Sequence, residues 1–368
     1  MSEKKTVKLS DICILEKGQQ IDTSLLDDSK PYRYINGGIK ESGYFDNFNT
    51  SGESVLISEG GASCGYINYV NEDFWCGCHC YRLHDIKVFP KYLFHALKAN
   101  QQRIMALRTG SAMPNIQKST IQKFELKIHD DLKIQQNISS MLDKCNVLIE
   151  KHKLILDKYD TLIKSRFIEM FGDPVNNTMK WETKTLSDWC TKVTDGTHDT
   201  PPRYTSGVLL LTGKNIRADH IDFTEIEYVS PEDHKIIYER CNPEYGDVLY
   251  TNIGVNYGTA VLNTLDYQFS MKNIALLKPK HDLVSGYYLW FVLNLLRNKI
   301  LDENKTGGAQ TFMSLATIRN LIIPMPPISL QNDFADFVQQ IDKSKFVVQK
   351  SLEKAETLYK TLMQEYFG

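Results

Sequence analysis

Two long stretches of the chain place apolar or large residues at alternating steps of three and four. In the first stretch these positions are Ile138, Leu142, Cys145, Ile149, His152, Leu156, Tyr159 and Ile163. In the second they are Phe334, Val338, Ile341, Lys345, Val348, Leu352, Ala355, Tyr359 and Leu362. Such spacing is typical of the a/d seam of a coiled coil, and it predicts long helices over residues 131–172 and 329–368.

The two helices have matching seams, so we expect them to pair with each other. A whole globular domain separates them in the sequence, which allows an antiparallel coiled coil. The alternative is that each helix packs only on its own domain, but the length of the seams favours the pair. Two seam positions, His152 and Lys345, are polar, and we expect Lys345 to extend its charge into solvent.

Outside the helices, short runs of β-branched and aromatic residues alternate with Gly and Asn. Glu53–Tyr69 and Asp247–Leu262 show this pattern, which predicts strands joined by tight turns. We therefore predict an α+β fold with two globular mixed α/β domains, residues 1–130 and 173–328, joined by the two long helices.

The chain also repeats itself. Phe171-Gly172 recurs as Phe367-Gly368, 196 residues later, and at the same offset Tyr92 matches Tyr288 and Gln135 matches Gln331. Two short segments also recur: Leu9–Cys13 resembles Leu186–Cys190, and Thr109–Ala112 resembles Thr306–Ala309. Similar helices alone would not repeat the Thr-Gly turns and the Phe-Gly ends, so we predict a tandem repeat with pseudo-two-fold symmetry.

Composition narrows the picture without supplying a function. Hydrophobic residues make up 42% and charged residues 24% of the 368 positions, as in a globular protein. The apolar run Tyr287–Leu296 is too short to span a bilayer, the N-terminal residues lack the apolar core of a signal peptide, and the eight cysteines are irregularly spaced. We expect a cytoplasmic protein with reduced thiols and no membrane partner. The net charge of -2 gives no support to a nucleic-acid partner.

Three segments resemble parts of enzyme motifs, but each lacks residues that the motif requires. Thr200–Arg203 has the two prolines of an amino-methyltransferase loop, without its Asp, Asn or Ser before them and its aromatic residue after them. Gly207–Lys214 is one residue too long for a phosphate loop, and Asn215 stands where a Ser or Thr binds Mg²⁺. Asp173 with Glu182–Lys184 lacks the further acidic ligands of a nuclease. We predict no catalytic residues.

One cysteine-rich segment has residue types that could bind zinc. Cys76, Cys78, His79 and Cys80 are close in sequence. On a single strand the three cysteines would share one face and His79 would take the other. Zinc sites more often have two or more residues between paired cysteines. We therefore expect a strand with buried thiols and no metal site.

Four polar loops are the surfaces most suited to contact a ligand: Tyr34–Tyr44, Ser58–Tyr66, Thr194–Tyr204 and Thr251–Tyr257. They are rich in Gly, Asn, Ser, Thr and Tyr. Such side chains contact base edges and phosphates, and glycine permits close backbone approach. Ordinary surface loops have the same composition, so this pattern alone does not decide between the two interpretations.

Taken together, the repeat, the seams and the loops resemble the specificity subunits of type I restriction-modification systems, over essentially the whole chain. The segments that carry the resemblance are Thr194–Lys214, Arg166–Pro174, Ile323–Gln331, and Gly37–Lys40 with Phe74–Tyr81. Asp130–Leu132 departs from the family pattern, because the Pro-rich run that precedes the second helix is missing before the first.

The resemblance implies a non-catalytic subunit whose two domains each read one part of a split site in double-stranded DNA. It implies that the helices set the spacing and bind two methyltransferase subunits, which methylate adenine at N6, and that restriction subunits can join them. S-adenosylmethionine, ATP and Mg²⁺ are then used by the partners, and this chain binds no cofactor or metal. From loop position, polarity and the resemblance, the candidate DNA-binding residues are Gly37, Gly38, Lys40, Tyr44, Glu59, Gly60, Ser63, Ser111, Asn115, Thr197, His198, Arg203, Tyr204, Lys214, Asn215, Asn252, Asn256, Tyr257 and Gln310.

Two other function classes stay open at this point. An autonomous methyltransferase or nuclease would need a motif that the sequence lacks. A coiled-coil adaptor that binds proteins instead of DNA would fit the net charge of -2 slightly better, because neutralising phosphates normally requires Lys and Arg.

Overall fold

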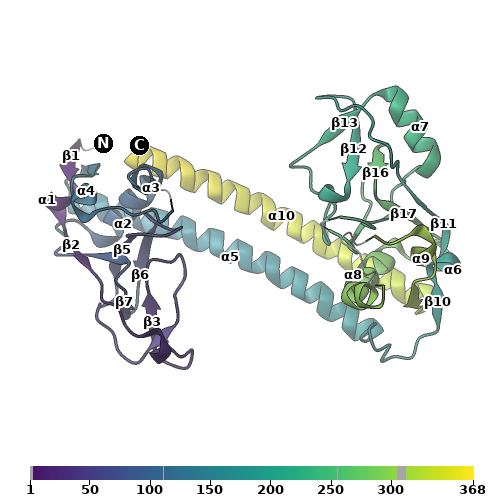
Figure 1. The fold of residues 1–368 in the computed structure, drawn as a ribbon, viewed down its shortest axis with the longest axis horizontal. Coiled ribbons are helices and arrows are strands. Elements are labelled where there is room, and N and C mark those ends of the chain that lie inside the picture. Colours follow the sequence, from purple (N-terminus) through teal and green to yellow (C-terminus); the bar gives the residue numbers. More distant parts are fainter. Residues whose placement is uncertain (1–2, 111, 255, 305–311) are drawn as a thin grey trace. The chain divides into compact units, whose positions relative to one another are not determined.

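The computed structural model describes residues 3–110, 112–254, 256–304 and 312–368. It divides into two compact units, Met1–Ile155 with Val348–Gly368, and Leu156–Val347. Two long helices, α5 (Leu132–Phe171) and α10 (Ile328–Phe367), contribute to both units, as the blue-green and yellow helices of Figure 1 show. Each unit therefore contains one globular domain and part of each long helix.

Three sheets form the first unit. A four-stranded antiparallel sheet has the order β2-β8-β5-β6, a three-stranded sheet has the order β4-β3-β7 with β3 and β7 parallel, and β1 pairs with β9. The strands are β1 Lys4–Lys8, β2 Ile14–Lys17, β3 Tyr32–Ile35, β4 Tyr44–Phe45, β5 Ser54–Ser58, β6 Ile67–Val70, β7 Phe74–Cys76, β8 Cys80–His84 and β9 Glu125–His129. The short helices are α1 Leu9–Ile12, η1 Thr23–Leu25, α2 Pro90–Ala99, α3 Gln101–Met105 and α4 Lys118–Gln122.

The second unit repeats this plan. Its sheets have the orders β11-β17-β14-β15 and β13-β12-β16, with β12 and β16 parallel, and β10 pairs with β18. The strands are β10 Thr183–Thr185, β11 Cys190–Asp195, β12 Val208–Thr212, β13 Glu227–Val229, β14 Val248–Tyr250, β15 Ala260–Leu262, β16 Ser270–Lys272, β17 Ala275–Pro279 and β18 Ile322–Pro324. The short helices are α6 Leu186–Trp189, η2 Gly213–Asn215, α7 Pro231–Cys241, α8 Gly286–Glu303 and α9 Leu315–Arg319.

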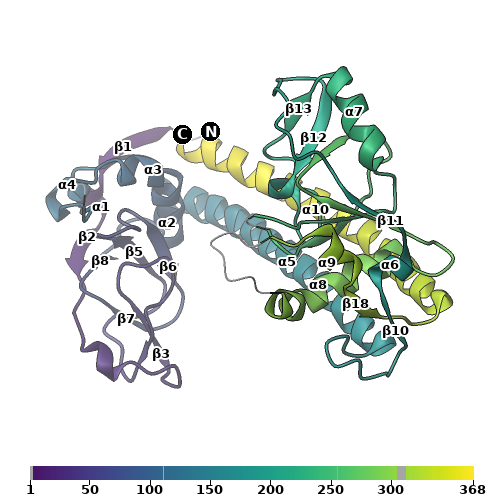
Figure 2. The ribbon, with the colours of Figure 1, turned by 45° about the vertical axis from the view of Figure 1, so that its right-hand side comes forward.

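One helix of the second unit, between β13 and β14, has no counterpart among the described residues between β4 and β5. Helix α7 lies beside the β13-β12-β16 sheet (Figure 2). Ser230 caps its first turn by accepting a hydrogen bond from the Asp233 amide, and Asn242 ends it in the left-handed conformation. Ile237 and Cys241 bury its inner face against strand residues of this sheet.

The sequence repeat is a structural repeat, down to single hydrogen bonds. The buried Gln135 side chain accepts a hydrogen bond from the Phe89 amide at 2.8 Å, at the N-cap of α2. Gln331, 196 residues later, accepts one from the Ser285 amide at 2.9 Å, at the N-cap of α8. Both glutamines stand in the first turns of a long helix, so each ties that helix to its domain.

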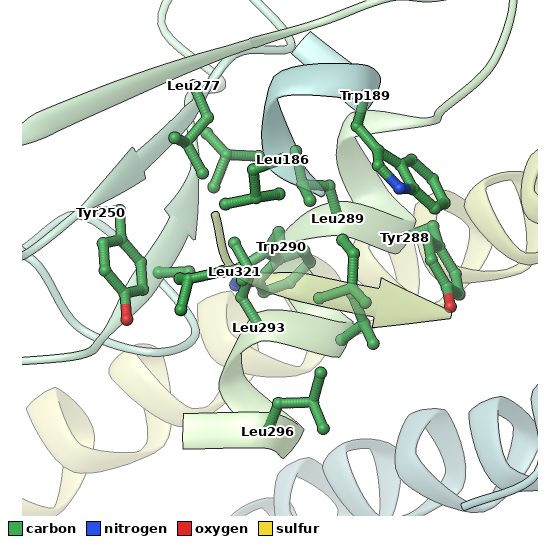
Figure 3. Packing of buried hydrophobic residues seen from close by; sticks show 14 of the residues in the cluster. Leu186, Trp189, Tyr250, Leu277, Tyr288, Leu289, Trp290, Leu293, Leu296 and Leu321 are labelled. Carbon is green, nitrogen blue, oxygen red and sulfur yellow. The ribbon is translucent and has the colours of Figure 1, made fainter. Parts of the chain in front are cut away.

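The core of the second unit lies between α6, α8, the four-stranded sheet and the long helices. Figure 3 shows Trp189 beside Tyr288, whose rings stack with centroids 6.0 Å apart. Tyr288 also packs edge-on against Phe171 at the end of α5, at 4.9 Å. In the first unit the matching Tyr92 packs against Phe367 at the end of α10, at 5.1 Å. The repeated Phe-Gly ends therefore close the two cores.

Within each unit α5 and α10 run antiparallel. In the first unit the Tyr366 hydroxyl donates to the Met141 sulfur at 3.9 Å. In the second, Phe167 packs against Phe334 with ring centroids 5.3 Å apart. The predicted seam positions that are buried are Leu142, Ile149, Ile163, Val338, Leu352 and Leu362, and those that are half-buried are Leu156, Ile341 and Val348. The predicted α+β fold with its antiparallel helix pair is confirmed.

Lys345 does not simply extend into solvent as we expected. Its ammonium lies 2.6 Å from Asp160 Oδ1 on the facing helix, and its side chain is 25% exposed. An acidic residue on α5 thus supplies a partner for the polar seam position.

The prediction of one continuous strand through Cys76–Cys80 was wrong. Strand β7 ends at Cys76, a turn contains Cys78 and His79, and β8 begins at Cys80. Cys76 and Cys80 are buried, but Cys78 is only half-buried. In the described part of the chain no His, Cys, Asp and Glu side chains are grouped so that they could hold a metal ion. No described helix is long and apolar enough to cross a membrane.

Candidate nucleic-acid interface

The parallel strands β3 and β7 bring distant loops of the first unit together, because parallel strands end at the same edge of a sheet. The Ser63 hydroxyl donates to the Gly37 carbonyl at 2.5 Å. The Glu59 amide donates to the His79 carbonyl at 2.8 Å. Predicted residues Gly37, Glu59 and Ser63 therefore lie together, and His79 joins them through the β7–β8 turn that we had not foreseen.

A further loop completes this first-unit cluster. Gly60 forms an antiparallel bridge with Asn115, and the Ile116 amide donates to the Glu59 carbonyl at 2.9 Å. On the other side, the Asn68 side chain donates to the Gly38 carbonyl at 3.2 Å. Gly38, Gly60 and Asn115 thus join Gly37, Glu59 and Ser63 in one cluster. These predicted residues come from three separate stretches of the sequence.

Glu59 is the buried anchor of the cluster. Its side chain is 9% exposed, and its Oε1 forms an ion pair with Lys17 Nζ at 2.7 Å. The Tyr81 hydroxyl donates to the same oxygen at 3.1 Å, and burial raises the pKa of Tyr81, so the phenol stays a donor. The Glu59 carboxylate therefore already has partners, and it fixes the loop more than it presents itself to a ligand.

Two predicted residues of the first half, Lys40 and Tyr44, stand apart from these contacts. Lys40 is exposed in the loop that follows Gly38. Tyr44 belongs to β4, where it pairs with Arg33 of β3. Ser111 lies outside the described residues.

In the second unit, the segment after β11 crosses the ends of the parallel strands. Thr197 bridges to Lys272 at the end of β16. The next residue, His198, is exposed, with Nε2 2.7 Å from Asp195 Oδ2 and Nδ1 3.1 Å from Asn273 Oδ1. Asp195 is buried and also pairs with Arg240 at 2.6 Å. Asp195 and Asn273 thus hold the His198 ring in a fixed orientation at the surface.

Further along the same segment, two predicted residues contact β13. Arg203 Nε lies 2.7 Å from Glu227 Oε2, and Tyr204 forms a bridge with Tyr228. Tyr204 is 48% exposed, so its ring is available to a ligand.

The η2 turn contains two predicted residues with different roles. Lys214 is exposed, whereas Asn215 is buried. Asn215 Oδ1 accepts from the Thr212 amide at 2.9 Å, and Nδ2 donates to the Asp222 and Glu225 carbonyls, both at 3.0 Å. The Asn215 amide is therefore committed to holding the turn that presents Lys214.

The segment after β14 supports the turn from the other side. Asn256 Nδ2 donates to the Gly213 carbonyl at 2.9 Å. Asn252 is buried and donates to the Met313 carbonyl at 3.3 Å, and the Tyr257 carbonyl accepts from Arg297 at 2.7 Å. Gln310 lies outside the described residues.

These segments enclose a groove of about 400 Å³ in the second unit. Its lining residues are Arg203, Thr212, Gly213, Lys214, Glu227, Ile253, Gly254, Lys272 and Asn273. We refer to it as the second-unit groove. It joins predicted residues Arg203 and Lys214 with Glu227, Lys272 and Asn273, which the sequence argument missed. A charged residue at the end of a short buried strand was the available signal for Lys272.

Each unit thus gathers donors and acceptors at the edge where its parallel strand pair ends. Asn, Ser, Lys, Arg and His side chains in such loops are suited to hydrogen bonds with base edges and phosphates, and glycine permits close backbone approach. The buried carboxylates Glu59 and Asp195 stabilise the loops from below through Lys17 and Arg240.

Comparison with known proteins identifies the family that this chain matches. A family model described as the type I restriction modification DNA specificity domain matches residues 1–158 and again residues 179–356. A Mycoplasma genitalium protein designated a type I specificity subunit is 23% identical over 357 residues, 96% of this chain and 91% of the relative. The EcoKI type I restriction enzyme specificity subunit of Escherichia coli is 22% identical over 73% of this chain and 62% of its own length.

A solved structure shares the fold. The crystal structure of the S subunit of a type I restriction-modification system from M. genitalium aligns with a TM-score of 0.76 and 21% identity. The alignment covers 100% of this chain and 96% of that one.

Proposed function

The chain belongs to the family of type I restriction-modification DNA specificity subunits, and from this premise we propose that it supplies the DNA sequence specificity of such a system. Each unit would read one part of a two-part site in double-stranded DNA. The observation that carries the proposal is the repeat itself. The two units place equivalent polar loops at the ends of equivalent parallel strands, β3 with β7 and β12 with β16.

We further propose that the paired helices set the distance between the two parts of the site. The antiparallel packing of α5 and α10 in both units supports this role, since each 40-residue helix passes from one unit into the other. A helix of that length extends over about 60 Å, which is sufficient to separate two reading domains by at least one helical turn of DNA.

The helices also offer a surface for partner subunits. Met141, Leu148, Ile155 and Leu162 of α5 are spaced seven apart and are exposed, 38–46% each. Each of these residues directly precedes a seam residue in the sequence, so the stripe runs along the edge of the seam, where Met141 also contacts Tyr366 of α10. Exposed apolar residues in such a row are typical of a protein interface, and we propose that methyltransferase subunits, two for two related units, dock along the helices.

The chemistry in this proposal belongs to the partners. Methyltransferase subunits would transfer a methyl group from S-adenosylmethionine to adenine N6, and restriction subunits would use ATP and Mg²⁺. The chain itself would be a non-catalytic reader and would act on chromosomal DNA in the cytoplasm.

Selection from a pool of randomised duplexes tests DNA reading directly. The chain, alone and with its methyltransferase subunits, is mixed with the pool, and the retained DNA is sequenced. We expect enrichment of two short sequences separated by a fixed unspecified spacer. If neither form retains duplex DNA, the chain is instead an adaptor between proteins. The net charge of -2 slightly favours that alternative.

A further inference from the structure

The second-unit groove is formed where two parallel strands end side by side. Thr212 at the end of β12 and Lys272 at the end of β16 are register partners. The η2 turn with Lys214 follows β12 directly, and Asn273 follows β16. The backbone therefore holds both lysines at one edge of the sheet, although they lie 58 positions apart in the sequence.

The charges in this groove do not balance. Glu227 is matched by Arg203, whose Nε lies 2.7 Å from the carboxylate and whose Nη1 donates to the Pro201 carbonyl. Lys272 Nζ donates to the Thr200 hydroxyl at 2.5 Å, and this neutral partner orients the ammonium without cancelling its charge. With Lys214 exposed in the η2 turn, the lining has a surplus of two positive charges.

The lining of the groove is open at Gly254. Gly254 has φ +93°, and a Cβ at this residue would meet nothing within 4 Å. A group larger than a single ion can therefore approach the two ammonium groups closely.

We infer that the second-unit groove holds a phosphate of the DNA backbone, with Lys272 and Lys214 as its cationic contacts. The inference rests on the proposed DNA-reading function and adds Lys272 as a positioning residue. Lysine is a compact point charge with freely rotating donors, which suits phosphate more than the patterned edge of a base. Because Arg203 and Glu227 satisfy each other, the remaining charge favours an anion.

The first unit cannot make the same contact at the corresponding place. The Gln19 amide donates to the Cys76 carbonyl and the Thr197 amide to the Met271 carbonyl, both at 2.9 Å. Cys76 therefore corresponds to Met271, and Gly77 to Lys272. A Cβ at Gly77 would come within 2.3 Å of Asn36 Oδ1. A lysine does not fit there without rearrangement, so the described part of the first unit has no counterpart of Lys272 at this place.

The test measures how salt affects DNA affinity in the complex of this chain with its methyltransferase subunits. Fluorescence anisotropy gives Kd for a duplex containing the methylated motif and for one lacking it, at several salt concentrations. The variants are Lys272→Met and Lys214→Met. Lys180→Met is the charge-matched control, since Lys180 is exposed in the same unit but outside the groove, and Lys272→Arg preserves the charge.

Removing one phosphate contact should reduce the slope of log K against log salt by ~0.9. The ratio of the Kd of K272M or K214M to the Kd of the unchanged protein should therefore fall about threefold between roughly 50 and 200 mM salt. The preferred sequence should not change, and K180M and K272R should behave like the unchanged protein.

Three results would overturn the inference. Equal salt slopes for K272M, K214M and K180M would show that the groove holds no phosphate. A new base preference in K272M would show that Lys272 reads a base. If the unchanged complex bound both duplexes equally, the proposed function would fail, and the inference with it.

Discussion

At the scale of single residues, the two units differ at a buried histidine. His95 is fully buried, with Nε2 3.0 Å from Asp143 Oδ1. Burial lowers the pKa of His95, although hydrogen bonding to Asp143 acts in the opposite direction. The matching position in the second half, 196 residues later, is Phe291, so the repeat itself shows which apolar side chain this site accommodates.

His95 should make the protein sensitive to mild acid. Because its pKa is lowered in the folded state, the unfolded chain binds a proton below about pH 6.5 that the folded protein does not. The free energy of unfolding should therefore fall as the pH drops from 7 to 5, and His95→Phe should reduce this fall. Urea unfolding at both pH values measures it, with the exposed His220→Asn variant as control. An unchanged pH dependence in His95→Phe would refute the assignment.

Two neighbouring candidate residues, Lys214 and Asn215, should behave differently. Asn215→Ala removes hydrogen bonds to Thr212, Asp222 and Glu225, and should lower the free energy of unfolding by ~1–3 kcal/mol. Lys214→Met, at an exposed position, should change it by less than about 0.5 kcal/mol. Denaturant melts of both variants give the comparison; equal effects would contradict the structural role of Asn215.

The sequence located polar loops better than it located the exposed side chains within them. Glu59, Asn215 and Asn252 were predicted as contact residues, and all three side chains are buried. Composition identifies a loop, but burial depends on strands that are distant in sequence. Lys272 was missed for the same reason, because its proximity to Lys214 arises only from the pairing of β12 with β16.

At the scale of elements, the long helices were the most predictable part of the fold. A heptad seam is a repeated signal that many residues share, so single polar exceptions such as Lys345 do not obscure it. The turn between β7 and β8 was missed because alternating cysteines look like one strand, and Gly77 alone did not mark the break. Helix α7 was not predicted either.

The pairing of α5 with α10 can be tested by insertion. Seven residues placed after His152 and seven after Val348 preserve the seam and lengthen the helices by about 10 Å. That is ~3 base pairs at 3.4 Å each, so the unspecified spacer in the methylated motif should lengthen by that amount with both recognised sequences retained. Two-residue insertions displace the seam and should abolish assembly. An active seven-residue variant with an unchanged spacer would show that the helices do not set the distance.

At the scale of the whole molecule, the repeat predicts separable specificities. Replacing Leu9–Lys127 with the matching domain of a relative should change one part of the target only. The packing of Tyr92 on Phe367 means that the donor domain must keep an aromatic residue at the position of Tyr92, or the first core will be damaged. Motif sequencing of the hybrid provides the readout, and a change in both parts would contradict modular reading.

The most direct test of DNA reading by this chain is methylation sequencing of the native genome with and without its gene, in cells that retain the methyltransferase. We predict that one adenine motif, made of two short sequences around a fixed spacer, is methylated only when the chain is present. Restoring the gene with Lys214→Met and Lys272→Met should return the same motif at lower occupancy. If every methylated motif persists without the chain, it does not supply sequence specificity.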